Sequence, residues 1–223
     1  MIRGLGLVAW LVPAIAIAQP STKPPDAAKV LAAVEATYKK PTDLTASFEQ
    51  TVVDAAFGRT TTSKGQLYVQ KPNKLRFDYA NAKGSLDKAV IFDGKTLWVV
   101  EPSKLQVLKH TPSSSALPSA ITFFTGAGSL AKDFKVALSS DPKYQAPGGL
   151  TLALVPKQPS AAYKELYLLV DPATNTVDRT IVIDSSGNTN TFVFGKPDTK
   201  GAIKPATFVF DPKKFPNYAV KTP

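Results

Sequence analysis

The 223-residue chain contains no cysteine and only one histidine. Without cysteine there are no disulfides, no thiolate nucleophile, no thiolate metal ligand and no lipid-modified cysteine. His110 alone cannot build a histidine-based catalytic triad or a multi-histidine metal site. We therefore expect no metal ion and no catalytic constellation in this protein.

Long apolar runs are also scarce, and the one that stands out lies at the N-terminus, from Leu5 to Ile17. Arg3 precedes it and Ala16-Ile17-Ala18 ends it, which is the pattern of a secretory signal peptide with its cleavage site. The run is shorter than the roughly 20 residues that span a bilayer. We expect residues 1–18 to be removed and residues 19–223 to form one exported, soluble domain.

Acidic residues are outnumbered, with 17 Asp and Glu against 27 Lys and Arg, for a formal net charge of +10. An exported basic protein can meet anionic lipids or acidic partners, but scattered lysines are explained equally well by solubility. In residues 74–79 charged residues alternate with apolar and aromatic ones. This alternation favours a half-buried strand over a nucleic-acid surface, so no nucleic-acid partner is expected.

Period-two alternation of apolar residues predicts strands through most of the chain. Leu67 and Val69 share one face of an extended segment, and Leu75, Phe77 and Tyr79 repeat the pattern after a turn. Further alternating segments precede and follow this central stretch, with turn dipeptides such as Asp-Gly between them. The pattern is typical of an antiparallel meander with one apolar face.

Two helical segments are predicted beside these strands. Asp26 can cap a helix that ends before Pro41, which places the helix near residues 26–40. Leu117, Ile121 and Phe124 recur at helical spacing and predict a short helix near residues 117–126. The expected fold is mainly β with some α: a single curved antiparallel sheet with helices on one side.

Motifs of known chemistry have no supporting context. Residues 126–131 match a dinucleotide fingerprint, but this fingerprint requires a βαβ unit and the downstream sequence predicts hairpins. Asp93, Asp171 and Asp184 all occur in turn sequences, where aspartate bonds its own backbone. No cofactor is expected, and the protein is predicted to bind a ligand rather than to catalyse a reaction.

Three blocks of sequence resemble the LolA family of periplasmic carriers of outer-membrane lipoproteins. They are Leu44–Gln50, Gly65–Tyr79 and Phe92–Trp98. The resemblance implies a half-open, incomplete β-barrel covered by a helical lid, with a hydrophobic cavity that holds lipoprotein acyl chains. It also implies a monomeric periplasmic carrier, not an enzyme. Its expected partners are triacylated lipoproteins, an inner-membrane ABC-type release complex and an outer-membrane receptor.

Candidate site residues follow from the apolar face and from this resemblance. Lys71 stands where the family usually carries an arginine that hydrogen-bonds the lid, so Lys71 is the expected lid latch. Packing in an ordinary core explains any single apolar candidate equally well. A periplasmic lipid- or glycolipid-binding sensor or chaperone on the same fold is the alternative function. The expected cavity floor is Phe48, Leu67, Val69, Leu75, Phe77 and Leu97, and the expected lid residues are Ile121, Phe123 and Phe124.

Overall fold

Most of the described chain forms β-strands, with short helices beside the sheet. The computed structural model describes residues 24–110, 123–125, 129–145, 147–159 and 163–222. The strands are β1 (Asp43–Asp54), β2 (Arg59–Gln70), β3 (Lys74–Ala80), β4 (Leu86–Phe92), β5 (Leu97–Glu101), β6 (Gln106–His110), β7 (Phe134–Leu138), β8 (Leu150–Pro156), β9 (Glu165–Asp171), β10 (Thr176–Ile183), β11 (Thr189–Phe194) and β12 (Ala219–Lys221). The helices are α1 (Ala27–Lys39) and the single turn α3 (Leu130–Asp133), with 3₁₀ turns η1 (Pro102–Lys104), η2 (Phe123–Thr125), η3 (Pro142–Tyr144), η4 (Pro205–Phe208) and η5 (Pro212–Lys214).

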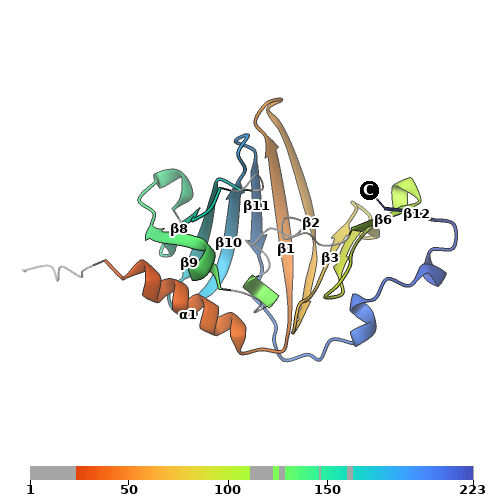
Figure 1. Cartoon of the computed structure of the whole chain (residues 1–223), viewed down its shortest axis with the longest axis horizontal. Coiled ribbons are helices and arrows are strands. Elements are labelled where there is room, and N and C mark those ends of the chain that lie inside the picture. Colours follow the sequence, from red (N-terminus) through yellow and green to blue (C-terminus); the bar gives the residue numbers. More distant parts are fainter. Residues whose placement is uncertain (1–23, 111–122, 126–128, 146, 160–162, 223) are drawn as a thin grey trace, which may run out of the picture.

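These strands form one 12-stranded sheet, in the order β12-β6-β5-β4-β3-β2-β1-β11-β10-β9-β8-β7. Neighbouring strands pair antiparallel, apart from β12, which runs parallel to β6. The edge strands β7 and β12 lie at opposite ends of the sheet, so the curved sheet does not close into a barrel (Figure 1). The predicted mainly β fold with a single curved, half-open sheet is confirmed, and the parallel pairing of β12 was not foreseen.

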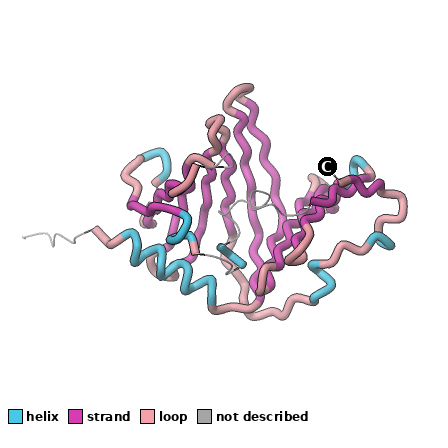
Figure 2. Tube along the Cα trace, in the orientation of Figure 1, coloured by secondary structure: helices cyan, strands magenta, loops and turns pink. Residues whose placement is uncertain are grey.

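Helix α1 lies alongside the strands rather than within the sheet (Figure 2). It begins where expected, because Asp26 Oδ1 accepts hydrogen bonds from the backbone N–H groups of Ala28 and Lys29 at 2.8 Å and 3.4 Å. It packs against the main core through Leu31, Val34 and Tyr38. The helix predicted near residues 26–40 is confirmed.

The second predicted helix falls mostly outside the described residues. Of the segment near 117–126, the structure describes only the 3₁₀ turn η2. This turn contacts α1 and β2, on the same side of the sheet as the main core.

The sheet has an inner face beneath α1 and an outer face that the chain covers with its own C-terminal part. On the outer face, Ile91 and Val100 are buried in a small cluster with Trp98, Phe210 and Phe215. The rings of Trp98 and Phe210 stack with centroids 4.9 Å apart. Residues from the last part of the chain therefore fill the outer face of β4 to β6, whereas the main core lies on the inner face.

Candidate functional site

The six apolar side chains expected to form a cavity floor all lie on the inner face of the sheet. Strand register sets this arrangement, because Leu67 lies opposite Phe77, and Leu75 lies opposite Phe92, which itself pairs with Leu97. The six exposed fractions are Phe48 4%, Leu67 0%, Val69 1%, Leu75 0%, Phe77 3% and Leu97 5%. Five of these residues belong to one buried apolar cluster, and Leu97 lies on the same face through its pairing with Phe92.

Aromatic rings form the centre of this cluster. Phe48 meets Phe77 and Tyr79 edge to face, with ring centroids 5.2 Å and 5.0 Å apart. Phe192 on β11 completes the cluster, 5.8 Å from Phe48 and 5.6 Å from Phe77. Tyr79 and Phe192 belong to the site but were not among the expected floor residues. The alternation of β3 already placed Tyr79 on this face, whereas the pairing of β11 with β1 gave no signal in the sequence.

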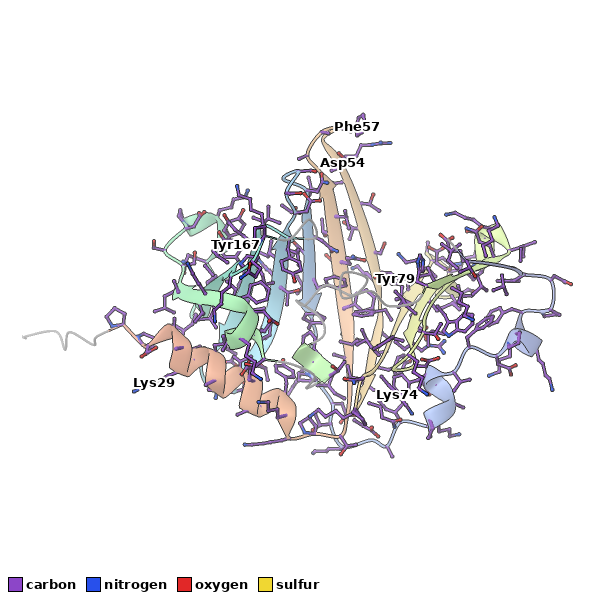
Figure 3. The ribbon with its side chains drawn as sticks, in the orientation of Figure 1. Lys29, Asp54, Phe57, Lys74, Tyr79 and Tyr167 are labelled. Atoms are coloured by element: carbon purple, nitrogen blue, oxygen red, sulfur yellow. The ribbon has the colours of Figure 1, made fainter. Side chains whose placement is uncertain are left out.

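A polar rim limits the apolar surface at one end. Lys88 pairs with Tyr79 across β3 and β4, and its Nζ lies 4.0 Å from the centre of the Tyr79 ring. Burial lowers the pKa of Lys88 and raises that of Tyr79 to about 12. Figure 3 labels Tyr79 in the half of the sheet that contains β3, and Phe57 at the tip of the β1–β2 hairpin. The aromatic cluster around Phe48 and Phe77 therefore ends in a cation–ring pair at Tyr79.

Phe124 is the expected lid residue whose side chain the structure describes. Its side chain is 3% exposed, and its ring meets Tyr38 of α1 and Phe194 of β11 edge to face, each at 4.9 Å. Phe123 belongs to η2, but its side chain lies outside the described part of the structure, as does the whole of Ile121. Of the three expected lid residues, Phe124 is thus the one whose contacts can be described.

Lys71 contacts the C-terminal end of α1. Its Nζ donates a hydrogen bond of 2.5 Å to the backbone carbonyl oxygen of Tyr38. The carbonyl groups of the last helical turn have no partner within the helix and carry the negative end of the helix dipole, so a cation stabilises them. Burial lowers the pKa of Lys71. Lys71 therefore joins the end of β2 to the end of α1 through one hydrogen bond.

Tyr38 connects α1 to the sheet at a second point. Its hydroxyl accepts a hydrogen bond of 2.9 Å from the backbone N–H of Val177 on β10. Burial raises the pKa of Tyr38 to about 12, and the bond from Val177 opposes this shift. The ring, the hydroxyl and the carbonyl of this residue therefore join η2, β10 and Lys71.

A crevice lined by Tyr38, Leu67 and Phe124, among others, has a volume of about 10 Å³. This is less than the roughly 30 Å³ that one water molecule occupies in the liquid. This crevice is too small to hold a ligand chain, and Leu67 is the expected floor residue that lines it.

Other chemistry is sparse in the described residues. Within residues 24–110, 123–125, 129–145, 147–159 and 163–222, no group of three or more His, Asp or Glu side chains could hold a metal ion. A search of the same part of the chain for a helix long and apolar enough to cross a membrane finds none.

Known proteins resemble this chain both in sequence and in the open-sheet fold. The profile of the family described as outer membrane lipoprotein carrier protein LolA matches residues 39–211. The chain belongs to the LolA family. The resemblance seen in the sequence blocks is therefore confirmed.

Relatives of this LolA-family chain carry the name outer-membrane lipoprotein carrier protein. The one from Chromobacterium violaceum is 26% identical over 191 residues, which is 85% of this chain and 87% of the relative. The one from Xanthomonas axonopodis pv. citri is 26% identical over 171 residues, which is 77% of this chain and 78% of the relative. Among solved structures, an uncharacterized conserved protein from Thermus thermophilus is 12% identical with a TM-score of 0.55, covering 88% of this chain and 99% of that one. This last likeness concerns the fold alone.

Proposed function

We propose that this LolA-family protein is a periplasmic carrier that binds the acyl chains of lipoproteins on its inner face and moves them from the inner to the outer membrane. The observation that carries the proposal is the apolar inner face of the open sheet, with α1 and η2 packed on it. Transfer of an acyl chain from water to an apolar surface gains about 0.8 kcal/mol for each CH₂ group, so a lipoprotein needs such a surface to cross an aqueous compartment. The proposed floor is Phe48, Leu67, Val69, Leu75, Phe77 and Leu97, with Tyr79 and Phe192 added.

Loading requires an opening of the closed conformation. The six floor residues are at most 5% exposed, and acyl chains would replace contacts such as those that Phe124 makes with Tyr38 and Phe194. Because the lid contacts compete with the cargo, they weaken net binding and favour release to a site that binds the cargo better. Lys71, which bonds the end of α1, sets part of this balance. Ile121 and Phe123 are the other two proposed lid residues, with the same proposed role as Phe124.

The cellular context of the proposal comes from the family and from the N-terminal sequence. Residues 1–18 would serve as a cleaved signal peptide, and residues 19–223 would act as one monomeric carrier domain. The carrier would accept triacylated lipoproteins from an inner-membrane ABC-type release complex and deliver them to an outer-membrane receptor. It would perform no catalytic step and need no cofactor.

A release assay tests this function. Purified protein is incubated with spheroplasts that synthesise labelled lipoproteins, and the medium is analysed for a soluble one-to-one complex. The variant Phe124→Asp, which places a charge under the lid, should release less lipoprotein, whereas Phe57→Asp at the exposed hairpin tip should act as wild type. Recovery of the protein with a free phospholipid or glycolipid, and with no lipoprotein, would refute the carrier role and favour a lipid-binding sensor or chaperone.

A further inference from the structure

A cleft with a volume of about 780 Å³ opens at the C-terminal end of α1. It lies between that helix end, the turn that joins β9 to β10, and the stretch that follows β11. Its volume falls within the range of roughly 300–1,000 Å³ that is common for small-ligand sites. The polar lining residues that the argument uses are Lys40, Asp171, Asp178, Lys196 and Thr199.

The cleft adjoins the proposed acyl-binding surface. Tyr38, Leu44 and Pro197 line both the cleft and the crevice beneath Phe124. The crevice also touches Leu67 of the proposed floor. A chain that left the inner face past Tyr38 would therefore enter this cleft.

The walls of the cleft suit a peptide better than an acyl chain. An acyl chain would remove water from carboxylate, ammonium and hydroxyl groups and offer them no hydrogen bond, which is costly. A polypeptide brings N–H and C=O groups that can bond them. Asp178 makes no hydrogen bond or ion pair within the described part of the chain, so its carboxylate is free to accept bonds from a ligand. Burial and the nearby Asp171 raise the pKa of Asp178, and donors from a ligand would oppose this shift.

The charges of the cleft have both signs. Lys40 and Lys196 lie on the side of α1 and the stretch after β11, and Asp171 and Asp178 lie on the side of β9 and β10. A site with both signs selects for neither acidic nor basic ligands. This arrangement fits a polypeptide, whose backbone N–H and C=O groups stay the same while its side chains vary.

We propose that this cleft binds the first residues of the polypeptide that follow the acylated cysteine of the cargo. The inference rests on the proposed carrier function, in which the acyl chains occupy the inner face. The peptide leaves that surface past Tyr38 and lies on an apolar floor of Leu44, Pro41 and Pro197, with its backbone bonded by the polar walls. Because Lys71 bonds the carbonyl of Tyr38 at the same place, an occupied cleft also affects how α1 is held.

The experiment compares two probes on the intact mature protein. One is a synthetic lipopeptide with a dipalmitoylated cysteine followed by Ser-Ser-Asn-Gly, and the other is palmitic acid, which has no peptide. Their affinities are measured by calorimetry for wild type and for Thr199→Trp, which fills the exposed cleft with a bulky side chain. The matched control is Thr61→Trp, on the exposed part of β2. A second variant, Asp178→Ala, removes the free carboxylate without adding bulk.

We expect Thr199→Trp to weaken lipopeptide binding about tenfold, which corresponds to about 1.4 kcal/mol, with palmitic acid binding unchanged. Asp178→Ala should change the lipopeptide affinity in the same direction, and Thr61→Trp should change neither affinity. Equal weakening of both probes would overturn the inference, because the cleft would then be part of the acyl path. Unchanged lipopeptide binding in both cleft variants would also overturn it. Failure of wild type to bind either probe would instead refute the carrier function itself.

Discussion

Removal of the Lys71 ammonium should loosen the C-terminal turn of α1 without unfolding the sheet. The variant Lys71→Met keeps most of the side-chain stem and deletes the donor that lies 2.5 Å from the carbonyl oxygen of Tyr38. A hydrogen bond that involves a charged group contributes about 1.5–3 kcal/mol, and a cation at a helix C-terminus contributes about 0.3–1 kcal/mol. Since Lys71 is partly exposed, solvent screening reduces these values, and we expect a loss of about 1–2 kcal/mol.

Hydrogen exchange followed by mass spectrometry measures this loss directly. A loss of 1–2 kcal/mol raises the population of the open state by a factor of about 5–30, so the amides of the last turn of α1 should exchange faster by that factor. Lys71→Arg should keep exchange slow, because its guanidinium also offers donors to the carbonyl. The control Lys64→Met removes a surface lysine from β2, the strand that ends just before Lys71; the Lys64 side chain is 74% exposed and pairs with Glu49. Unchanged exchange in Lys71→Met, or an equal increase in Lys64→Met, would refute the latch.

Three other predictions concern stability. Gly65→Ala should lower the free energy of unfolding, measured by urea titration, by about 3 kcal/mol, because a Cβ at this position would lie 1.9 Å from the Asp78 carbonyl oxygen. The control Gly201→Ala has open space around the new Cβ and should change this free energy by less than about 0.5 kcal/mol. Phe124→Ala should cost about 3 kcal/mol through the loss of its ring contacts, and Phe57→Ala, where the ring is 71% exposed, should cost almost nothing; equal losses would contradict the burial of the lid. Folding raises the pKa of Tyr38 and Tyr79 from 10.0 to about 12. The protonated forms of these residues therefore add stability that is complete below pH 10 and is lost as the pH rises to about 12. The urea midpoint should fall over that window, and it should fall less in the double variant Tyr38→Phe/Tyr79→Phe.

Local patterns in the sequence predicted much of the fold. The alternation of apolar residues along β2 and β3 reports directly which side chains share a face, because successive side chains of a strand point to opposite sides. The same logic separates Leu97 on the inner face from Trp98 on the outer face. The start of α1 was predictable because its cap, Asp26, bonds residues only two and three positions away.

Features that depend on distant parts of the chain could not be predicted in this way. β12 pairs with β6 through a strand of three residues, too short to produce a visible alternation. Phe210 and Phe215 lie near the end of the chain, yet they cover the outer face of strands that occur far earlier in the sequence. The cleft at the end of α1 likewise collects residues from three separate segments. No short-range pattern reports such an assembly.

The sequence predicted which apolar residues share the inner face, but not what packs on that face. The chosen apolar residues do share one face, as alternation requires, but the sequence does not say whether such a face is filled by the protein's own side chains. In the structure the six chosen residues are at most 5% exposed, and Phe124 packs against Tyr38 and Phe194 on the same side of the sheet. Phe192 was missed as a site residue because its neighbour β1 lies about 140 positions earlier, as the bond between Gln50 and Asn190 illustrates.

The central claim is that acyl chains bind on the inner face, and fluorescence quenching by bromine-labelled lipid tests it most directly. Trp98 reports on the outer face, and a Phe92→Trp variant in a Trp98→Phe background reports on the inner face of the adjacent strand. Addition of a lipopeptide with brominated acyl chains should quench the tryptophan at position 92 and leave Trp98 of the wild type bright. Quenching of Trp98 alone, or of neither tryptophan, would contradict binding on the inner face.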